Sequence, residues 1–147
     1  MGNYIDSTDV QNRLRRNFEP LYTPRGWTSS DSDIVDADIE AAEADLHSYI
    51  AARYRVPVTD TEAVKLLKHW ALTLVEEIAY GSIPGRKVPD NIAERAKALH
   101  ERLERIAAGD LSLGTASTVT QATTGAGADV MTDGPDPVFT RDQMEGF

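Results

Sequence analysis

The sequence predicts an all-α protein, a four-helix bundle followed by a long, mostly irregular C-terminal arm. Three observations support this class. Apolar residues recur at helical spacing in four segments that precede Gly109. Proline and glycine cluster between these segments, where they are typical of turns. Beyond Gly109 apolar residues become sparse, and no segment of the chain reads clearly as a β-strand.

The first expected helix spans residues 8–18, with Ser7 as its N-cap. Pro20 is expected to end it, because proline lacks the backbone N–H that a helix interior needs. Its narrow apolar face consists of Val10, Leu14 and Phe18. Residues 20–31 then form a loop whose apolar side chains are expected to fold back onto the bundle, namely Leu21, Tyr22 and Trp27.

The second expected helix spans residues 33–55 and ends before Pro57. Its start is strongly acidic, but an EF-hand calcium loop is not expected there. Counted from Asp31, the fifth and sixth places hold Val35 and Asp36 instead of an oxygen ligand and a glycine. The packing stripe of this helix consists of Val35, Ile39, Ala42, Leu46, Tyr49 and Arg53.

The third expected helix spans residues 59–80, with Thr59 and Glu62 as a capping box. It is apolar on most of its surface, so it is expected at the centre of the bundle. Its one polar line consists of Lys65, His69, Thr73, Glu76 and Tyr80. A fourth helix is expected to be capped by Asp90 and closed by Gly109, and its apolar stripe consists of Ile92, Ala96, Leu99, Leu103 and Ile106.

The chain is therefore divided into a helical body, residues 1–109, and an extended arm, residues 110–147. The body carries 18 acidic and 14 basic residues, whereas the arm carries 6 acidic residues and only Arg141 as a base. Residues 111–132 are rich in Thr, Ala and Gly and offer almost nothing to bury, as expected of a linker.

Composition excludes several classes of function. The net charge of −9 disfavours general binding to nucleic acid, which depends on Lys and Arg. The absence of cysteine excludes disulfides and thiolate chemistry. No secretion signal and no apolar run of membrane-spanning length is visible, so a soluble intracellular protein is expected.

No catalytic site, metal site or cofactor site is expected, and the chain is not expected to be an enzyme. Its three histidines, His47, His69 and His100, fall on three different helices, and none has the spacing of a helical zinc site. Separate surface or packing roles are the preferred interpretation. The serines lie outside any GxSxG nucleophile motif.

The extreme C-terminus carries the main candidate for partner binding. After the polar linker, apolar side chains return within ten residues, as Val138, Phe139, Met144 and Phe147. A tethered apolar cluster of this kind is typical of a docking segment. The interpretation preferred here is docking on another subunit or protein, and the alternative is that the cluster folds back onto its own bundle.

Several segments together resemble Mu-like tailed-phage head–tail connector, or head-completion, proteins. They are residues 4–7 (YIDS), residues 49–54 (YIAARY) with residues 56–58 (VPV), residues 106–109 (IAAG) leading into residues 111–114 (LSLG), and residues 138–147 (VFTRDQMEGF). The linker before the last motif is longer here than in the family. The resemblance adds Arg141 and Asp142 to the expected partner-binding residues.

The resemblance implies a structural protein of the virion neck that is made in the cytoplasm of the bacterial host. Such adaptors form a homo-oligomeric ring, twelve-fold by resemblance, beneath the portal protein and above a tail-side neck or stopper protein. The genome DNA passes through without specific binding, and no membrane is involved. The alternative from a different class is a soluble helical adaptor or regulatory module that recruits a partner through its C-terminal motif.

Overall fold

The computed structural model describes residues 2–114, and every regular element in this range is helical. The elements are α1 (Ser7–Leu14), the 3₁₀ turn η1 (Arg15–Asn17), α2 (Phe18–Tyr22), α3 (Ser32–Ile50), α4 (Thr61–Gly81) and α5 (Asp90–Ala108). No β-strand occurs between residues 2 and 114. The prediction of an all-α bundle is confirmed.

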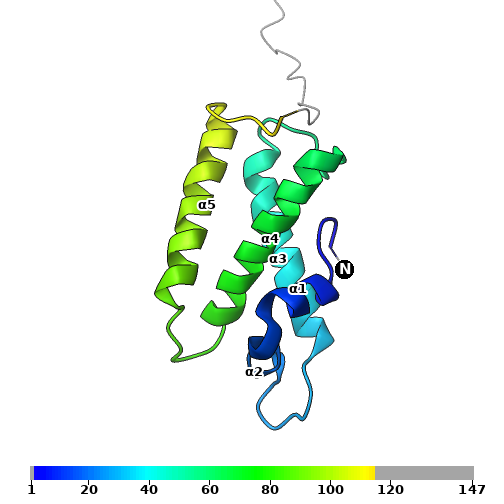
Figure 1. Cartoon of the computed structure of the whole chain (residues 1–147), viewed down its shortest axis with the longest axis vertical. Helices are drawn as coiled ribbons and strands as arrows, with labels where there is room; N and C mark the ends of the chain where they lie inside the picture. Colours follow the sequence, from blue (N-terminus) through cyan, green and yellow to red (C-terminus); the bar gives the residue numbers. More distant parts are fainter. Residues whose placement is uncertain (1, 115–147) are drawn as a thin grey trace, which may run out of the picture.

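Helix α4 lies at the centre of the bundle, as its apolar surface predicts. It contacts α1, α2, α3 and α5. Helices α3 and α5 also contact each other, so the three long helices form a triangular bundle, against which α1 and α2 pack at one side (Figure 1). Because α4 meets neighbours on several sides, most of its circumference must be apolar.

The core is continuous through all the helices and follows the predicted stripes. Helix α3 buries Val35, Ile39, Ala42 and Leu46, and α5 buries Ile92, Ala96, Leu99, Leu103 and Ile106. In the polar line predicted for α4, however, three residues are buried, namely Thr73, Glu76 and Tyr80. They are buried because α1 and α5 cover this side of α4.

The first helix is broken where the sequence predicts continuity. Arg15 has a φ of +51°, outside helical geometry, and the chain resumes as η1 and α2. Pro20 does not end a helix but lies in the first turn of α2. Backbone N–H groups in the first turn have no intrahelical acceptor, so the N–H that proline lacks is not missed there. The N-cap is Asp6 instead of Ser7, because Asp6 and Asp9 form a reciprocal capping box.

The loop after α2 folds back only in part. Leu21 and Tyr22 are buried as predicted, whereas Trp27 is 58% exposed, so the prediction for Trp27 is wrong. The Tyr22 carbonyl accepts a hydrogen bond from the Asp31 N–H, which closes the base of the loop. Trp27 lies at its tip, in a turn closed by a bond from its N–H to the Pro24 carbonyl.

Three further helix boundaries differ from the prediction. Helix α3 ends at Ile50 rather than at residue 55, so Arg53 leaves the packing stripe and is exposed. Helix α4 is capped by Asp60 instead of Thr59, through a bond that its carboxylate accepts from the Ala63 N–H. Asp90 is the first residue of α5 and not its cap, because Pro89 occupies that place.

Gly109 ends α5 as predicted. Its φ of +91° lies in the left-handed region, which glycine adopts without a steric penalty. The division of the chain at this residue stays a prediction. Two residues beyond it nevertheless pack on the body, because Leu113 is buried and Leu111 is partly buried. The expectation that this stretch buries almost nothing is therefore wrong for its first residues.

Candidate interaction surfaces

The partner-binding residues predicted at the C-terminus lie outside residues 2–114. This applies to Val138, Phe139, Arg141, Asp142, Met144 and Phe147.

The N-terminal segment is held on α3 by a buried carboxylate. The side chain of Glu43 accepts hydrogen bonds from the backbone N–H groups of Asn3, Tyr4 and Ile5, over 2.6, 2.7 and 3.2 Å. The residue is only 3% exposed. Three backbone donors replace the water that a carboxylate loses on burial, so Glu43 acts as a structural anchor.

Tyr4 extends this anchor to the segment between α3 and α4. Its hydroxyl accepts a hydrogen bond from the Val58 N–H at 2.9 Å and lies 2.9 Å from His47 Nε2. Burial raises the pKa of Tyr4, and burial lowers the pKa of His47 despite the nearby Glu43 carboxylate. Both shifts favour the neutral forms, so the tyrosine hydroxyl can donate to a neutral imidazole.

A second tyrosine holds the first residues of the arm. The Tyr54 hydroxyl accepts a hydrogen bond from the Leu113 N–H at 2.8 Å, and both residues are buried. At Gly109, a side chain would collide with the guanidinium group of Arg53. The segment after α3 therefore contacts both the N-terminus, through Val58, and the start of the arm, through Tyr54.

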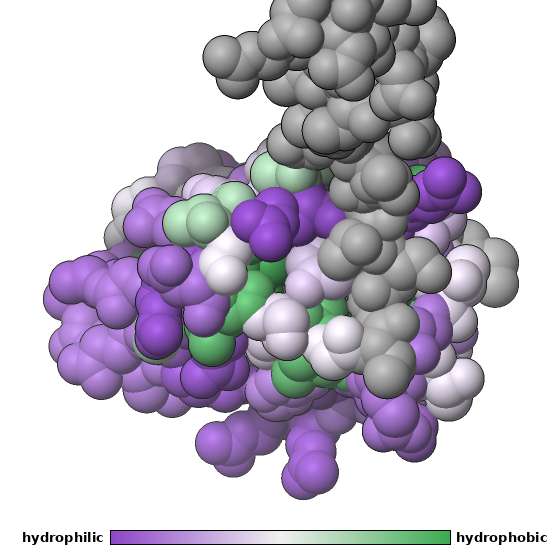
Figure 2. Space-filling model, turned by 90° about the horizontal axis from the view of Figure 1, so that it is seen from above, coloured by the Kyte–Doolittle hydropathy of each residue, from purple (hydrophilic) through white to green (hydrophobic). Residues whose placement is uncertain are grey.

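The end of the bundle where the described chain stops carries a small apolar surface. Figure 2 looks onto this end and shows a few hydrophobic residues surrounded by hydrophilic ones. Leu66 is 39% exposed and lines a hollow with Ala63 and Leu113, whose polar edge includes Asp60 and Glu62. The described chain thus ends beside a mixed apolar and acidic surface.

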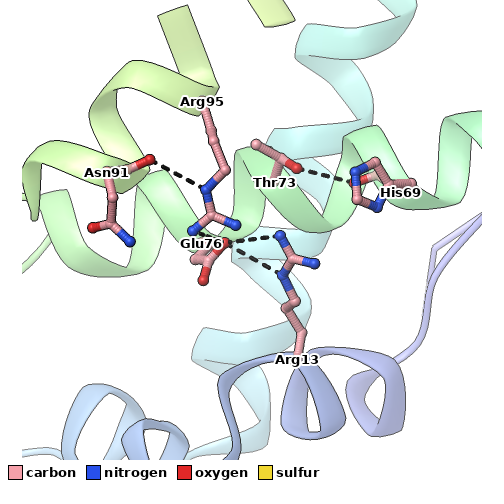
Figure 3. A network of polar contacts seen from close by, with 6 residues as sticks. All are labelled: Arg13, His69, Thr73, Glu76, Asn91 and Arg95. Atoms are coloured by element: carbon pink, nitrogen blue, oxygen red, sulfur yellow. Dashed lines mark hydrogen bonds and ion pairs between the residues drawn. The ribbon is translucent and has the colours of Figure 1, made fainter. Parts of the chain in front are cut away.

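Glu76 joins three helices from the side of α4. Its Oε2 lies 3.3 Å from both Nε and Nη2 of Arg13 in α1 and 3.4 Å from Nη2 of Arg95 in α5 (Figure 3). Arg95 also donates from Nε to the Asn91 carbonyl. One nearly buried carboxylate therefore neutralises part of the charge of two arginines and ties α1 and α5 to α4.

Beside this network, α4 and α5 enclose a shallow groove, named here the α4–α5 groove. It is lined by His69, Trp70 and Thr73 from α4 and by Arg95, Leu99 and Arg102 from α5. The Arg102 guanidinium lies 6.0 Å from the centre of the Trp70 ring, at the outer edge of a cation–π contact. The groove has an apolar floor and arginines on its α5 side.

Tyr22 in α2 and Asp38 in α3 are close enough to influence each other, but within the described residues neither the Tyr22 hydroxyl nor Asp38 Oδ2 has a hydrogen-bond partner, although both atoms are buried. Burial raises the pKa of both groups, and the neighbouring Asp38 carboxylate raises the pKa of Tyr22 further. The phenol of Tyr22 therefore stays protonated.

The three histidines have different surroundings. His47 contacts Tyr4, His100 Nε2 lies 3.2 Å from Asp45 Oδ2, and His69 borders the α4–α5 groove. In the region from residue 2 to 114, no group of three His, Asp or Glu side chains is placed to hold a metal ion. None of the helices in this region is both long and apolar enough to span a membrane.

The fold and its surfaces define a small all-α protein whose buried polar side chains join helices and anchor both ends of the described chain. The chain belongs to the phage family described as Bacteriophage Mu, Gp36, whose model matches residues 4–132. This membership confirms the resemblance to Mu-like phage proteins. No curated protein matches the chain.

Sequence reasoning missed the roles of several residues that lie within the resembling segments. Tyr4, Tyr54 and Leu113 are all buried and hydrogen-bonded across the body. Their signal in the sequence is weak, since none of the three belongs to an apolar stripe that helix periodicity predicts. The segments that carry the family resemblance include all three residues, but the resemblance assigned them no role.

Proposed function

We propose that this protein is a head–tail connector that forms a ring beneath the portal protein, joins the head to the tail and lets the genome pass. The observation that carries the proposal is membership of a phage Mu family over residues 4–132. This membership favours a phage structural or morphogenesis role, with the neck of the virion as the proposed location.

The body has properties that suit a ring subunit. Its core connects all the helices, and buried polar contacts anchor both the N-terminal segment and the first residues of the arm. A closed ring needs two different faces on each subunit, and a bundle of this shape supplies them. The net charge of −9 suits a passage that must not hold the DNA phosphates.

The arm is proposed to make the contact with the portal protein or with a neighbouring subunit. Its candidate docking residues are Val138, Phe139, Arg141, Asp142, Met144 and Phe147. Four apolar side chains on a long tether bind weakly alone, because their burial competes with the entropy of ordering the backbone. Many arms on one ring bind together with far greater strength.

Deletion of residues 138–147 tests this role. We expect the truncated protein to keep its helical circular dichroism spectrum and to fail to join purified heads to tails. The matched control is a deletion of ten linker residues, 118–127, which leaves the terminal motif in place and should preserve joining. Normal joining by the protein without residues 138–147 would refute the docking role.

Mass measurement separates the connector from the alternative of a regulatory binding module. A connector is expected to form a large homo-oligomer at high concentration or together with portal protein. A chain that remains monomeric in both conditions would favour the module.

A further inference from the structure

We propose that the α4–α5 groove of one subunit binds the outer face of α3 of the next subunit in the ring. The outer face of α3 is defined here by six of its exposed residues, Asp33, Ala37, Glu40, Ala41, Ala44 and Ser48. The inference rests on the ring of the proposed function and assigns the two faces that build it.

The groove side of the contact is positively charged. Arg95 and Arg102 line the groove, and Arg13 lies beside it. Arg13 and Arg95 share one carboxylate, that of Glu76. Within the described chain, Arg102 contacts the Trp70 ring and forms no ion pair with a carboxylate. The groove therefore retains positive charge although the whole protein is acidic.

The α3 side of the contact is negatively charged. Helix α3 carries six acidic residues and no lysine or arginine. Asp33 and Glu40 are both exposed on its outer face, and the alanines between and beyond them are exposed too. Their small side chains allow a neighbouring chain to approach the helix closely, so that carboxylates and arginines can meet across the contact.

The spacing of the charges matches. Asp33 and Glu40 are seven residues apart, and so are Arg95 and Arg102. In a helix this separation places both side chains on one face, about 10.5 Å apart along the axis. Two carboxylates on α3 can therefore face two guanidinium groups on α5 in one alignment of the helices.

The two faces cannot meet within one subunit. Helix α3 packs its inner side against both α4 and α5, so its outer face points away from the groove between them. Figure 1 shows α3 behind α4, on the far side of the bundle from the viewer. A contact between two different, opposite faces is heterologous, which is the type that generates a ring when the rotation closes.

Charge-reversed variants of the full-length protein test the assignment. The groove variant carries Arg95→Glu and Arg102→Glu, and the α3 variant carries Asp33→Lys and Glu40→Lys. Each alone is expected to associate at least tenfold more weakly than the wild type in sedimentation velocity. An equimolar mixture of the two variants should assemble again. The acidic groove of the groove variant then meets the basic α3 of the α3 variant, and the native groove of the α3 variant meets the native α3 of the groove variant.

The controls use exposed residues of α5 that do not line the groove. Lys97→Glu and Glu104→Lys should assemble like the wild type. Since Arg95→Glu adds a carboxylate next to Glu76, Arg102→Glu alone is the second groove variant, and circular dichroism verifies that each variant is folded. Sodium chloride at 0.5 M should shift the wild type towards monomer, because exposed charges are screened.

Two results would overturn the inference in distinguishable ways. If folded groove and α3 variants assemble like the wild type, the assignment of faces is wrong while the proposed ring stands. If the wild type stays monomeric with and without portal protein, the ring of the proposed function fails as well.

Discussion

At the scale of single residues, buried polar side chains define how the ends of this body are held. Glu43 is nearly inaccessible to water, yet it replaces its lost hydration with backbone donors from the N-terminal segment. These hydrogen bonds join residues about forty positions apart and restrain the N-terminus. Helix periodicity cannot predict such contacts, because it concerns residues a few positions apart. The same arrangement explains why Gly2 lies close to Glu43, where a side chain would collide with the carboxylate.

Replacement of Glu43 by glutamine should lower the free energy of unfolding by about 2–4 kcal/mol, because it places an amide NH₂ opposite backbone N–H donors and removes the charge. Urea denaturation measures this change. The control is Glu104→Gln on the exposed side of α5, which should alter stability by less than about 0.5 kcal/mol. Equal stability of the two variants would contradict the anchoring role of Glu43.

At the scale of helices, the central position of α4 follows from its composition, but the way its neighbours attach does not. Glu76 belongs to a line of polar residues on α4 that helix periodicity assigns to solvent. In the structure, Arg13 from α1 and Arg95 from α5 converge on it. Helices α1 and α5 therefore attach to α4 through a residue of this polar line.

Substitution of Glu76 by glutamine should leave two neighbouring guanidinium groups without their shared carboxylate. We expect a loss of about 1–2 kcal/mol in the free energy of unfolding, with faster amide hydrogen exchange in α1. Glu62→Gln is the comparison, since its ion pair with Lys65 is exposed and contributes at most about 0.5 kcal/mol. Unchanged exchange in α1 would show that Arg13 and Glu76 do not hold this helix.

At the scale of the whole molecule, the body extends slightly beyond its last helix. Leu111 and Leu113 pack on the core after the chain has turned at Gly109, and Tyr54 holds the Leu113 backbone. If the C-terminal arm acts as proposed, its start is expected after this anchor and not at Gly109.

Two truncations test the position of this boundary. A chain that ends at residue 114 should keep the helicity and the unfolding midpoint of the full-length protein. A chain that ends at residue 109 should be less stable by about 2–4 kcal/mol, because it loses the burial of Leu113 and a buried hydrogen bond. Thermal unfolding followed by circular dichroism compares them, and identical midpoints would place the boundary back at Gly109.

The sequence by itself determined the helical class, the three long helices, the central place of α4 and the closing role of Gly109. These features depend on local rules: apolar residues every three or four positions make one buried face, and only glycine readily adopts the left-handed conformation at a helix end. Local signals also misplaced three N-caps by one residue: Asp6 replaces the predicted Ser7, Asp60 replaces Thr59, and Pro89 replaces Asp90.

Only the tertiary structure decided which polar residues are buried, where the first helix breaks and how the chain ends are anchored. The contacts of Glu43 with Tyr4, of Glu76 with Arg13 and of Tyr54 with Leu113 join positions 39 to 63 residues apart. The sequence around each of these residues does not indicate its partner, because the two meet only after the helices have packed. The candidate contact between the α4–α5 groove and α3 has the same origin, since it combines faces of separate helices.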